Sequence, residues 1–306
     1  MLGRFLQKDA VAAITALDLP DTVKRHCVEV IWKGYTVIPG AVPAEQCASL
    51  IHDFRALEQR NEEIFAANRN KDGHYPRIVN LHMAFPQLID LFTKNTLHLA
   101  VSDALFGGRT SLYTSLFYET GSQQPIHRDT PVFCTRPEYL YFGNTVYLEA
   151  ANDENGCLEV IEGGHLTGEL DRELLATEHY GALEKVTAQD DAMWVTYQAG
   201  VVQRCDNRGL KTTRLHVQPG DTLIWHPQLP HGGSPIRDKS KTRFSLVMHT
   251  TPEGVPVYHQ DAFFRPNMAY SETAGWAYRD VDGRKIVDQQ GISFGHVNDY
   301  PLTAFR

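Results

Sequence analysis

The central half of the chain consists of short segments rich in β-branched and aromatic residues, each closed by a turn signal. "TSLYTSLFYET" (110–120) and "NTVYLEA" (144–150) have this composition, and "GCLEVIEGGH" (156–165) ends in a Gly-Gly turn. "TRLHVQPGDTLIWHP" (213–227) predicts two strands joined at "QPGD", and "TRFSLVMHT" (242–250) alternates strongly. Short strands of this kind bury their apolar sides only by packing sheet on sheet, so the pattern predicts a barrel or sandwich.

The segments before this region predict helices. Residues 43–68 place most of their apolar side chains on one stripe, and residues 85–107 are expected to be helical and to end at the following glycines. "GYTVIPG" (34–40) predicts a short strand closed by Pro-Gly. The expected fold class is therefore mainly β with flanking helices.

We expect residues 1–306 to form a single domain. Its parts would be a helical N-terminal region (about 1–108), a β core (about 109–252) and a C-terminal extension (about 253–306). Residues 166–195 predict a helical or irregular insertion into the core. The aromatic tail that begins the extension could be a lid, an oligomer contact or simple packing.

Composition limits the classes of partner. A net charge of −8 disfavours general binding to nucleic acid, which needs a basic face. The five cysteines contain no CxxC pair, so they suggest reduced thiols rather than a zinc ribbon or disulfide framework. No apolar run approaches the roughly 18 residues of a membrane span, and no signal peptide is evident. We expect a cytoplasmic protein with a small-molecule substrate; the sequence leaves its oligomeric state open.

The stretch "QQPIHRDTPVF" (123–133) contains a His-x-Asp pair. In an extended strand, residues two apart point to the same face, so His127 and Asp129 could supply two ligands of one metal ion. Surface loops often contain the same pair, so a partner set is needed. Two histidines and one carboxylate are the protein ligands of non-haem Fe(II) oxygenases.

The partner set occurs about a hundred residues later, in "PGDTLIWHPQLPHGGSPIRDKSKTRFSLVMH" (219–249). His231 precedes Gly-Gly-Ser, which is a plausible position for a third ligand at a barrel mouth. Arg243 shares a strand face with Ser245, Val247 and His249, and a buried guanidinium requires an anionic partner. Its planar fork suits the distal carboxylate of 2-oxoglutarate, to which Ser245 could add a hydrogen bond.

Several other residues compete for these roles. His226 is the main rival as third ligand, but its place within a strand beside Trp225 favours a core histidine. His165 is interpreted as a turn residue, and His216 and His249 as strand residues without an evident partner. Arg237 is expected in a solvated loop, and Glu159 and Glu162 are interpreted as ordinary strand residues. Ser234 has no His-Asp arrangement around it that would form a hydrolase triad.

Four blocks in order carry a resemblance to a known family: "GYTVIPGAVPAEQCASL" (34–50), "HRD" (127–129), "NGCLEVIEGGH" (155–165) and the 219–249 stretch. The chain resembles the phytanoyl-CoA dioxygenase (PhyH) family of Fe(II)/2-oxoglutarate-dependent oxygenases. The resemblance implies a double-stranded β-helix, which is a jelly roll of cupin-like form. It also implies O2 as cosubstrate, together with Fe(II) held by His127, Asp129 and His231 and 2-oxoglutarate held by Arg243.

The resemblance extends to further residues. Thr145 and Gln124 are candidates to lie near 2-oxoglutarate, although either could be an ordinary polar strand residue. Relatives that halogenate have a small residue where this chain has Asp129, so the carboxylate favours hydroxylation or a related oxidation. The expected reaction is oxidation of a C–H bond of a small metabolite or natural product, with decarboxylation of 2-oxoglutarate to succinate.

Features around the substrate are less specific. Arg128, Phe133, Tyr139 and Tyr141 are candidates to line the pocket. The basic segment 195–217 could attract an anionic substrate, but a solvated hairpin face is the simpler interpretation. Two other classes stay open: a cupin-like metalloprotein, such as an isomerase or lyase that does not use 2-oxoglutarate, and a non-catalytic ligand-binding jelly roll.

Overall fold

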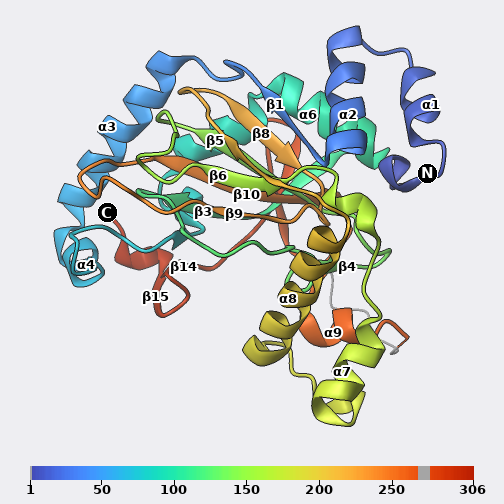
Figure 1. Ribbon diagram of the computed structural model, residues 1–306. Helices are drawn as coiled ribbons and strands as arrows, with labels where there is room; N and C mark the ends of the chain where they lie inside the picture. Colours follow the sequence, from blue (N-terminus) through green and yellow to red (C-terminus); the bar gives the residue numbers. More distant parts are fainter. Residues whose placement is uncertain (1, 268–275) are drawn as a thin grey trace.

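The computed structural model describes residues 2–267 and 276–306, so part of the aromatic tail, residues 268–275, lies outside the described residues. A large, mainly antiparallel sheet forms the body of the molecule (Figure 1). Its strands, in spatial order, are β1 (Tyr35–Ile38), β8 (Thr222–Trp225), β5 (Phe142–Tyr147), β10 (Ser245–Pro252), β3 (Thr110–Tyr118), β2 (Ile78–Val79), β14 (Gly291–Phe294) and β15 (Asn298–Pro301). The hairpin of β12 (Tyr278–Val281) and β13 (Arg284–Val287) joins β3 through a parallel pairing of Ile286 with Leu112.

A smaller sheet faces this one. It contains β7 (Thr212–Leu215), β6 (Leu158–Ile161) and β9 (His231–Gly233), and an isolated bridge between His127 and His231 adds the His-x-Asp segment at its edge. Buried residues from both sheets pack between them: Tyr147, Val160, Leu215, Leu223 and Trp225. The two antiparallel sheets face each other, and the chain passes repeatedly from one sheet to the other. This arrangement is the predicted jelly-roll fold.

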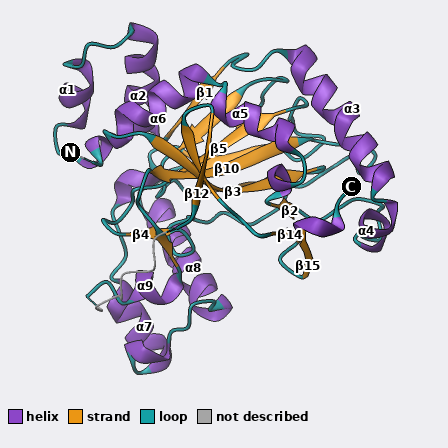
Figure 2. Ribbon diagram, turned by 180° about the vertical axis from the view of Figure 1, so that it is seen from behind, coloured by secondary structure: helices purple, strands orange, loops and turns teal. Residues whose placement is uncertain are grey.

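Helices cover the outer face of the large sheet (Figures 1 and 2). Helix α3 (Ala44–Arg60) buries Leu50 and Phe54 against Phe117, Leu246 and Met248 of β3 and β10. The other helices of this part are α1 (Ala10–Thr15), α2 (Asp21–Lys33), α4 (Glu62–Ala67), α5 (Asp90–Thr93) and α6 (Thr96–Phe106). Short 3-10 turns lie at Arg4–Leu6, Leu81–Met83, Pro86–Ile89, Gly164–Thr167, Leu183–Lys185 and Leu302–Ala304.

The expected N-terminal helices are confirmed with two interruptions. The helix predicted over 43–68 breaks at Asn61, whose φ of −123° is not helical, so α3 and α4 are separate. The segment 85–107 begins as a 3-10 turn and α5 before α6 starts. It ends as predicted, because Gly107 adopts a left-handed conformation with φ 71°.

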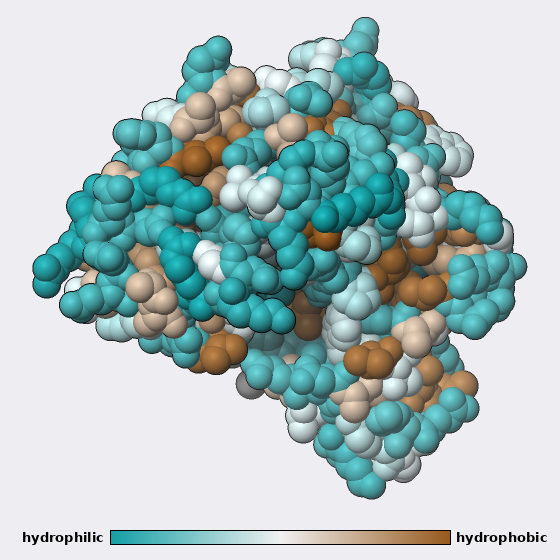
Figure 3. Space-filling model, turned by 60° about the vertical axis from the view of Figure 1, so that its left-hand side comes forward, coloured by the Kyte–Doolittle hydropathy of each residue, from teal (hydrophilic) through white to brown (hydrophobic). Residues whose placement is uncertain are grey.

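A lobe projects from one end of the sheets, at the lower right of Figure 1. It contains α7 (Arg172–Tyr180), α8 (Asp191–Asn207) and α9 (Gln260–Phe264), beside the two-stranded sheet of β4 (Cys134–Thr135) and β11 (Val257–Tyr258). Its helices share a small core of their own: Ala176, Met193, Tyr197, Val201, Phe263 and Phe264. The space-filling view in Figure 3 shows a hollow between this lobe and the body, with apolar surface at its base.

The hairpin prediction for residues 195–217 is wrong. Most of that segment belongs to α8, which begins where the Asp190 side chain accepts a hydrogen bond from the Met193 backbone N–H. Met193, Tyr197 and Val201 recur every four residues and are buried, which is helical spacing. None of the helices within residues 2–267 and 276–306 has both the length and the apolar character to cross a bilayer.

Candidate metal centre and cosubstrate pocket

Three side chains converge between the two sheets. His127 lies in the extended segment that pairs with β9, His231 begins β9, and Asp129 follows His127 by two residues on the same side. His127 Nε2 lies 3.5 Å from Asp129 Oδ1, and His231 Nε2 lies 3.7 Å from Asp129 Oδ2. One potential ligand atom from each residue lies within 4.8 Å of the other two, and all three residues are buried. A single ion can contact all three atoms.

Hydrogen bonds fix both imidazoles in the orientation that a metal requires. His127 Nδ1 donates to the Pro125 carbonyl at 2.8 Å, and His231 Nδ1 donates to the Leu229 carbonyl at 2.9 Å. Each ring therefore carries its proton on Nδ1 and turns the lone pair of Nε2 towards Asp129. This is how metal-ligating histidines are usually held. Burial also lowers the pKa of His231 to about 4, so this ring is neutral at neutral pH.

The carboxylate of Asp129 is oriented from the other side. Tyr141 Oη donates to Asp129 Oδ2 at 2.9 Å, and Trp225 Nε1 donates to the same oxygen at 3.0 Å. Burial by itself would raise the pKa of Asp129, but the charge that His231 gains at acid pH, together with the neighbouring His127, outweighs burial and holds this pKa well below its usual range. The indole has room because residue 143 is glycine: a Cβ there would lie 2.0 Å from the Trp225 ring.

A third histidine, on β10, contacts the residues that orient Asp129. His249 Nδ1 hydrogen-bonds Tyr141 Oη, and Phe133 stacks on the His249 ring with centroids 4.1 Å apart. Because the phenol has one proton, which Asp129 accepts, His249 is the donor to Tyr141. No partner for His249 is evident from the sequence, which predicts that Tyr141 and Phe133 line a substrate pocket. The structure instead places Tyr141 against the carboxylate, with Phe133 packed behind it.

Arg243 lies just before β10, deep between the sheets. Its side chain is 5% exposed, and Nη1 donates to the Gly156 carbonyl at 2.6 Å. The guanidinium carbon lies 5.9 Å from the centre of the Tyr147 ring. Arg243 Nε is buried with no hydrogen-bond partner among the described residues, and the same holds for Ser245 Oγ. A buried cation and a hydroxyl that both lack an acceptor are what a carboxylate ligand would satisfy.

The alternation predicted for β10 is confirmed. Ser245, Val247 and His249 point to the concave side, whereas Leu246 and Met248 pack towards α3. Thr145 on β5 lies opposite Val247 and therefore points to the same concave face.

The structure places Thr145 and Gln124 differently. Thr145 is buried on the face that carries Ser245, which is the position expected of a residue near 2-oxoglutarate. Gln124 is half-buried at the edge of the smaller sheet, where its backbone carbonyl accepts from Gly233 N–H at 2.9 Å. No described contact brings the Gln124 side chain to Arg243.

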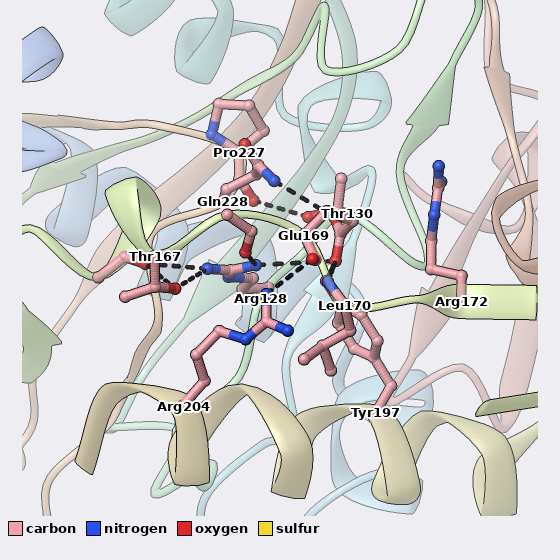
Figure 4. Close-up of polar contacts among 12 residues, drawn as sticks. Arg128, Thr130, Thr167, Glu169, Leu170, Arg172, Tyr197, Arg204, Pro227 and Gln228 are labelled. Carbon is pink, nitrogen blue, oxygen red and sulfur yellow. Dashed lines mark hydrogen bonds and ion pairs between the residues drawn. The ribbon is translucent and has the colours of Figure 1, made fainter. Parts of the chain in front are cut away.

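The prediction that Arg128 lines a substrate pocket is wrong. Neighbouring residues of an extended segment point to opposite sides, so Arg128 points away from the side on which its two neighbours meet. Its guanidinium is fully buried and donates to the carbonyls of Gly164 and Gly168 and to Thr167 Oγ1 (Figure 4). Arg128 therefore attaches the His-x-Asp segment to the loop that leads into the lobe.

One side chain of helix α8 hydrogen-bonds the backbone of the same segment. Gln198 Oε1 accepts from the Arg128 backbone N–H at 2.8 Å, and Gln198 Nε2 donates to the Arg128 carbonyl at 2.9 Å. The Gln198 amide therefore satisfies the two backbone groups of Arg128 that a neighbouring strand would otherwise pair with. Trp194, one turn earlier on α8, brings its ring to 5.7 Å from that of His127.

Glu169 joins the lobe to the barrel. Its carboxylate accepts from Tyr197 at 2.7 Å, Tyr139 at 3.1 Å and Gln228 Nε2 at 3.2 Å, as Figure 4 shows in part. Its carbonyl accepts from Arg204 at 2.7 Å. Tyr139, expected in the substrate pocket, is thus used at this junction.

The rival residues have other contacts. His226 lies next to His165, with ring centres 4.9 Å apart, and its Nδ1 accepts from the Gln228 N–H. His165 bonds the Ile31 carbonyl, which agrees with a structural role. His216 lies 3.3 Å from Asp153, and Arg237 is exposed.

Comparison with known proteins adds an independent line of evidence. A profile described as phytanoyl-CoA dioxygenase (PhyH) matches residues 32–245, which is more than half of the chain. No curated protein matches the sequence. The match includes every residue of the candidate centre and the pocket around Arg243.

Solved structures share the fold at low identity. The epimerase SnoN, in complex with Fe3+, alpha ketoglutarate and nogalamycin RO, is 16% identical with a TM-score of 0.59, covering 88% of this chain and 99% of its own. The carbocyclase SnoK from nogalamycin biosynthesis is 16% identical with a TM-score of 0.55, covering 81% and 88%. EctD from S. alaskensis, with 2-oxoglutarate and 5-hydroxyectoine, is 16% identical with a TM-score of 0.54, covering 74% and 75%. By its family match, the chain belongs to the phytanoyl-CoA dioxygenase (PhyH) family and is a non-haem iron, 2-oxoglutarate-dependent oxygenase.

Proposed function

We propose that His127, Asp129 and His231 bind Fe(II), that Arg243 and Ser245 bind the distal carboxylate of 2-oxoglutarate, and that the enzyme hydroxylates a C–H bond of a small metabolite or natural product. The observation that carries the proposal is the meeting of two features on one concave face. One is a two-histidine, one-carboxylate cluster. The other is a buried arginine whose Nε has no acceptor among the described residues.

The residues of the chain have distinct tasks in this reaction. When bound, iron with 2-oxoglutarate and O2 supplies the oxidising power that removes hydrogen from an unactivated C–H bond. The carbonyls of Pro125 and Leu229 hold the imidazoles in the binding tautomer, and Tyr141 and Trp225 orient the carboxylate. Burial excludes bulk water from the centre, which protects a reactive site from side reactions.

Asp129 supports hydroxylation over halogenation. Its carboxylate points at the two imidazoles, and both of its oxygens are engaged there. A halide would need the coordination position that this carboxylate is placed to fill. The buried Arg243 in turn favours 2-oxoglutarate use over a cupin-like isomerase or lyase, which would have no need of a second anion site.

The test is Fe(II)-dependent conversion of 2-oxoglutarate to succinate, measured by mass spectrometry in air. The wild type should form succinate, and Asp129→Ala and Arg243→Ala should each lose at least about 100-fold in rate, as expected when a buried charged contact worth roughly 3 kcal/mol is removed. Arg237→Ala, which alters an exposed arginine nearby in sequence, is the control. Full activity in both site variants would refute the assignment.

A further inference from the structure

Four aromatic rings in contact lead outward from the candidate metal centre. Tyr141 donates its phenol proton to Asp129, and Phe133 stacks on the Tyr141 ring with centroids 4.9 Å apart and planes 6° from parallel. Tyr113 meets Phe133 edge to face, with centroids 6.3 Å apart. Trp276 stacks on Tyr113 at 4.5 Å, with planes 10° from parallel. Tyr141 is fully buried and Trp276 is half-buried, so this aromatic series joins the centre to solvent.

A β-bulge in β3 directs Tyr113 into this series. The register between β10 and β3 shifts between His249 and Thr250, which leaves Tyr113 as an extra residue in β3. Thr114, the next residue, lies opposite His249 on the concave face. Tyr113 reaches the same side, because its ring meets Phe133, which stacks on His249. Successive strand residues normally alternate, so the bulge is what allows both to face the centre.

The C-terminal extension supplies the outer ring. Trp276 directly precedes β12, and the β12–β13 hairpin is joined to β3 by the parallel pairing beside Tyr113. Gln289, just after β13, donates through Nε2 to the Tyr113 carbonyl at 2.8 Å. Trp276 lies outside residues 32–245, the part of the chain that matches the family profile. The contact between Trp276 and Tyr113 is therefore a feature of this extension.

The rings of the series differ in their redox chemistry. Phenol and indole rings give up one electron far more readily than a benzene ring, and electrons transfer readily between aromatic rings in contact. Tyr141, Tyr113 and Trp276 can therefore each hold an oxidising equivalent, whereas Phe133 can only bridge its neighbours. Apolar packing requires no oxidisable ring, yet the series has one at each end and one between them.

We propose that the aromatic series carries oxidising equivalents from the centre to the surface when 2-oxoglutarate is consumed without substrate. This inference rests on the proposed function, because it takes Asp129 as an iron ligand. Decarboxylation of 2-oxoglutarate by O2 leaves one oxygen atom and two oxidising equivalents at the centre. With no substrate C–H bond to oxidise, these equivalents damage the surrounding residues, and reactive sites depend on preventing such side reactions.

The electrons and atoms of this process balance. Two electrons pass one at a time from Trp276 to Tyr113 and, across Phe133, to Tyr141 and the centre. Each tyrosine is restored by the next electron and recovers its proton. At the centre, two electrons and two protons from solvent reduce the oxygen atom to water. At the surface, the Trp276 indole loses two electrons and two protons and gains the oxygen of one water molecule. Ascorbate, an ene-diol reductant, can supply both electrons instead and leave the indole intact.

The test incubates the full chain with Fe(II) and 2-oxoglutarate in air, without substrate or reductant and with catalase to remove free peroxide. Succinate is measured, and oxygen addition at each tryptophan is mapped by peptide mass spectrometry. We expect Trp276 to gain oxygen as succinate accumulates, and ascorbate to suppress this gain. Trp32, which is 62% exposed but outside the series, reports oxidants free in solution and should stay as it is without 2-oxoglutarate.

A pair of variants tests the route. Tyr113→Phe keeps a ring in the stack but removes the oxidisable phenol, so oxidation of Trp276 should fall to the level seen at Trp32. Tyr278→Phe is the matched control, because the Tyr278 ring lies 6.4 Å from Trp276 but is not one of the rings that join it to the centre. Its Trp276 should be oxidised as in the wild type. The anaerobic charge-transfer band of the 2-oxoglutarate chelate checks that the centre is intact in both variants.

The outcomes separate this inference from the proposed function. Trp194 and Trp225 lie beside the candidate ligands, with ring centres 5.7 Å from His127 and 5.1 Å from His231, respectively. Succinate formation with oxidation confined to these two tryptophans, or with none above the level of Trp32, would overturn the route. Wild-type oxidation of Trp276 in Tyr113→Phe would overturn it as well. A protein that forms no succinate would instead overturn the proposed function, and this inference with it.

Discussion

Single residues in this site are placed by the alternation of strands. His127 and Asp129 meet because they are two residues apart in an extended segment, and the intervening Arg128 is directed to the opposite side. The same rule puts Ser245 and His249 on the concave face of β10. Alternation was therefore sufficient to predict which of these residues meet, and it also explains why the Arg128 prediction failed.

Arg243→Lys tests whether the buried guanidinium is a carboxylate receptor. Lysine keeps the charge but loses the planar fork and cannot reproduce Nε, so we expect the dissociation constant of 2-oxoglutarate to rise at least about tenfold. Equilibrium dialysis with labelled 2-oxoglutarate and Fe(II), without O2, measures it. Arg237→Lys, at an exposed position, should bind as the wild type does. Equal affinity in Arg243→Lys would show that the fork is not used.

At the scale of elements, the lobe and the metal-binding segment form one unit. Helix α8 contacts that segment through Gln198, which is 4% exposed and bonds both backbone groups of Arg128. Arg128 in turn bonds the 164–168 loop, so each element holds the other. The geometry of the iron ligands is therefore expected to depend on a helix that contributes no ligand.

Gln198→Ala should weaken metal binding while leaving the chain folded. It leaves a buried N–H and C=O at residue 128 without partners, and supports behind metal ligands typically contribute about 10- to 100-fold in affinity. Competition with a chromogenic chelator measures the affinity for Fe(II) or Co(II), and circular dichroism checks the fold. Gln203→Ala, on the exposed side of the same helix, is the matched control. An unchanged affinity would show that α8 only packs against the segment.

Helix α6 is joined to β5 by a buried histidine. His98 Nε2 donates to Asn144 Oδ1 at 2.9 Å, and burial lowers the pKa of His98 to about 4. In the unfolded chain the pKa returns to about 6.5, so the unfolded state binds more protons between pH 4 and 6.5. Stability contributed by the neutral ring is present above that window and is lost as the pH falls through it.

His98→Gln should therefore make stability less sensitive to pH. The amide can still donate to Asn144 but does not titrate, so the variant should lose about 2 kcal/mol less free energy of unfolding than the wild type between pH 7 and pH 5. Urea denaturation at both pH values provides the comparison. His179→Gln, at an exposed position on α7, should lose as much as the wild type. Parallel losses in all three proteins would contradict the account.

Across the whole molecule, local patterns predicted a barrel or sandwich, and the family resemblance implied the jelly roll and the grouping of the four site residues. Strand alternation, turn glycines and the His-x-Asp spacing are all visible within short windows. Contacts that join distant segments could not be predicted in this way. Gln198 lies 70 residues from Arg128, and neither α8 nor the hairpin β14–β15 carries a pattern that reveals its partner.

The roles of the aromatic residues were misjudged for a related reason. Tyr139, Tyr141 and Phe133 lie close together in sequence, which suggested one pocket wall. The structure separates Tyr139 from the other two, since Tyr139 bonds Glu169 of the lobe junction, whereas Phe133 stacks on Tyr141, which bonds Asp129. Residue composition predicted that the loop is aromatic and buried, but only the packing of the lobe determines which ring faces the centre.

The most direct test of the account is an anaerobic titration of the full chain with Fe(II) and then with 2-oxoglutarate. Bidentate binding of 2-oxoglutarate to iron produces a weak visible charge-transfer band. We expect the band in the wild type and in Arg237→Ala, and its absence in Asp129→Ala and Arg243→Ala at the same concentrations. A wild-type protein that binds Fe(II) without forming the band, or a band of full intensity in both site variants, would contradict the assignment of this centre.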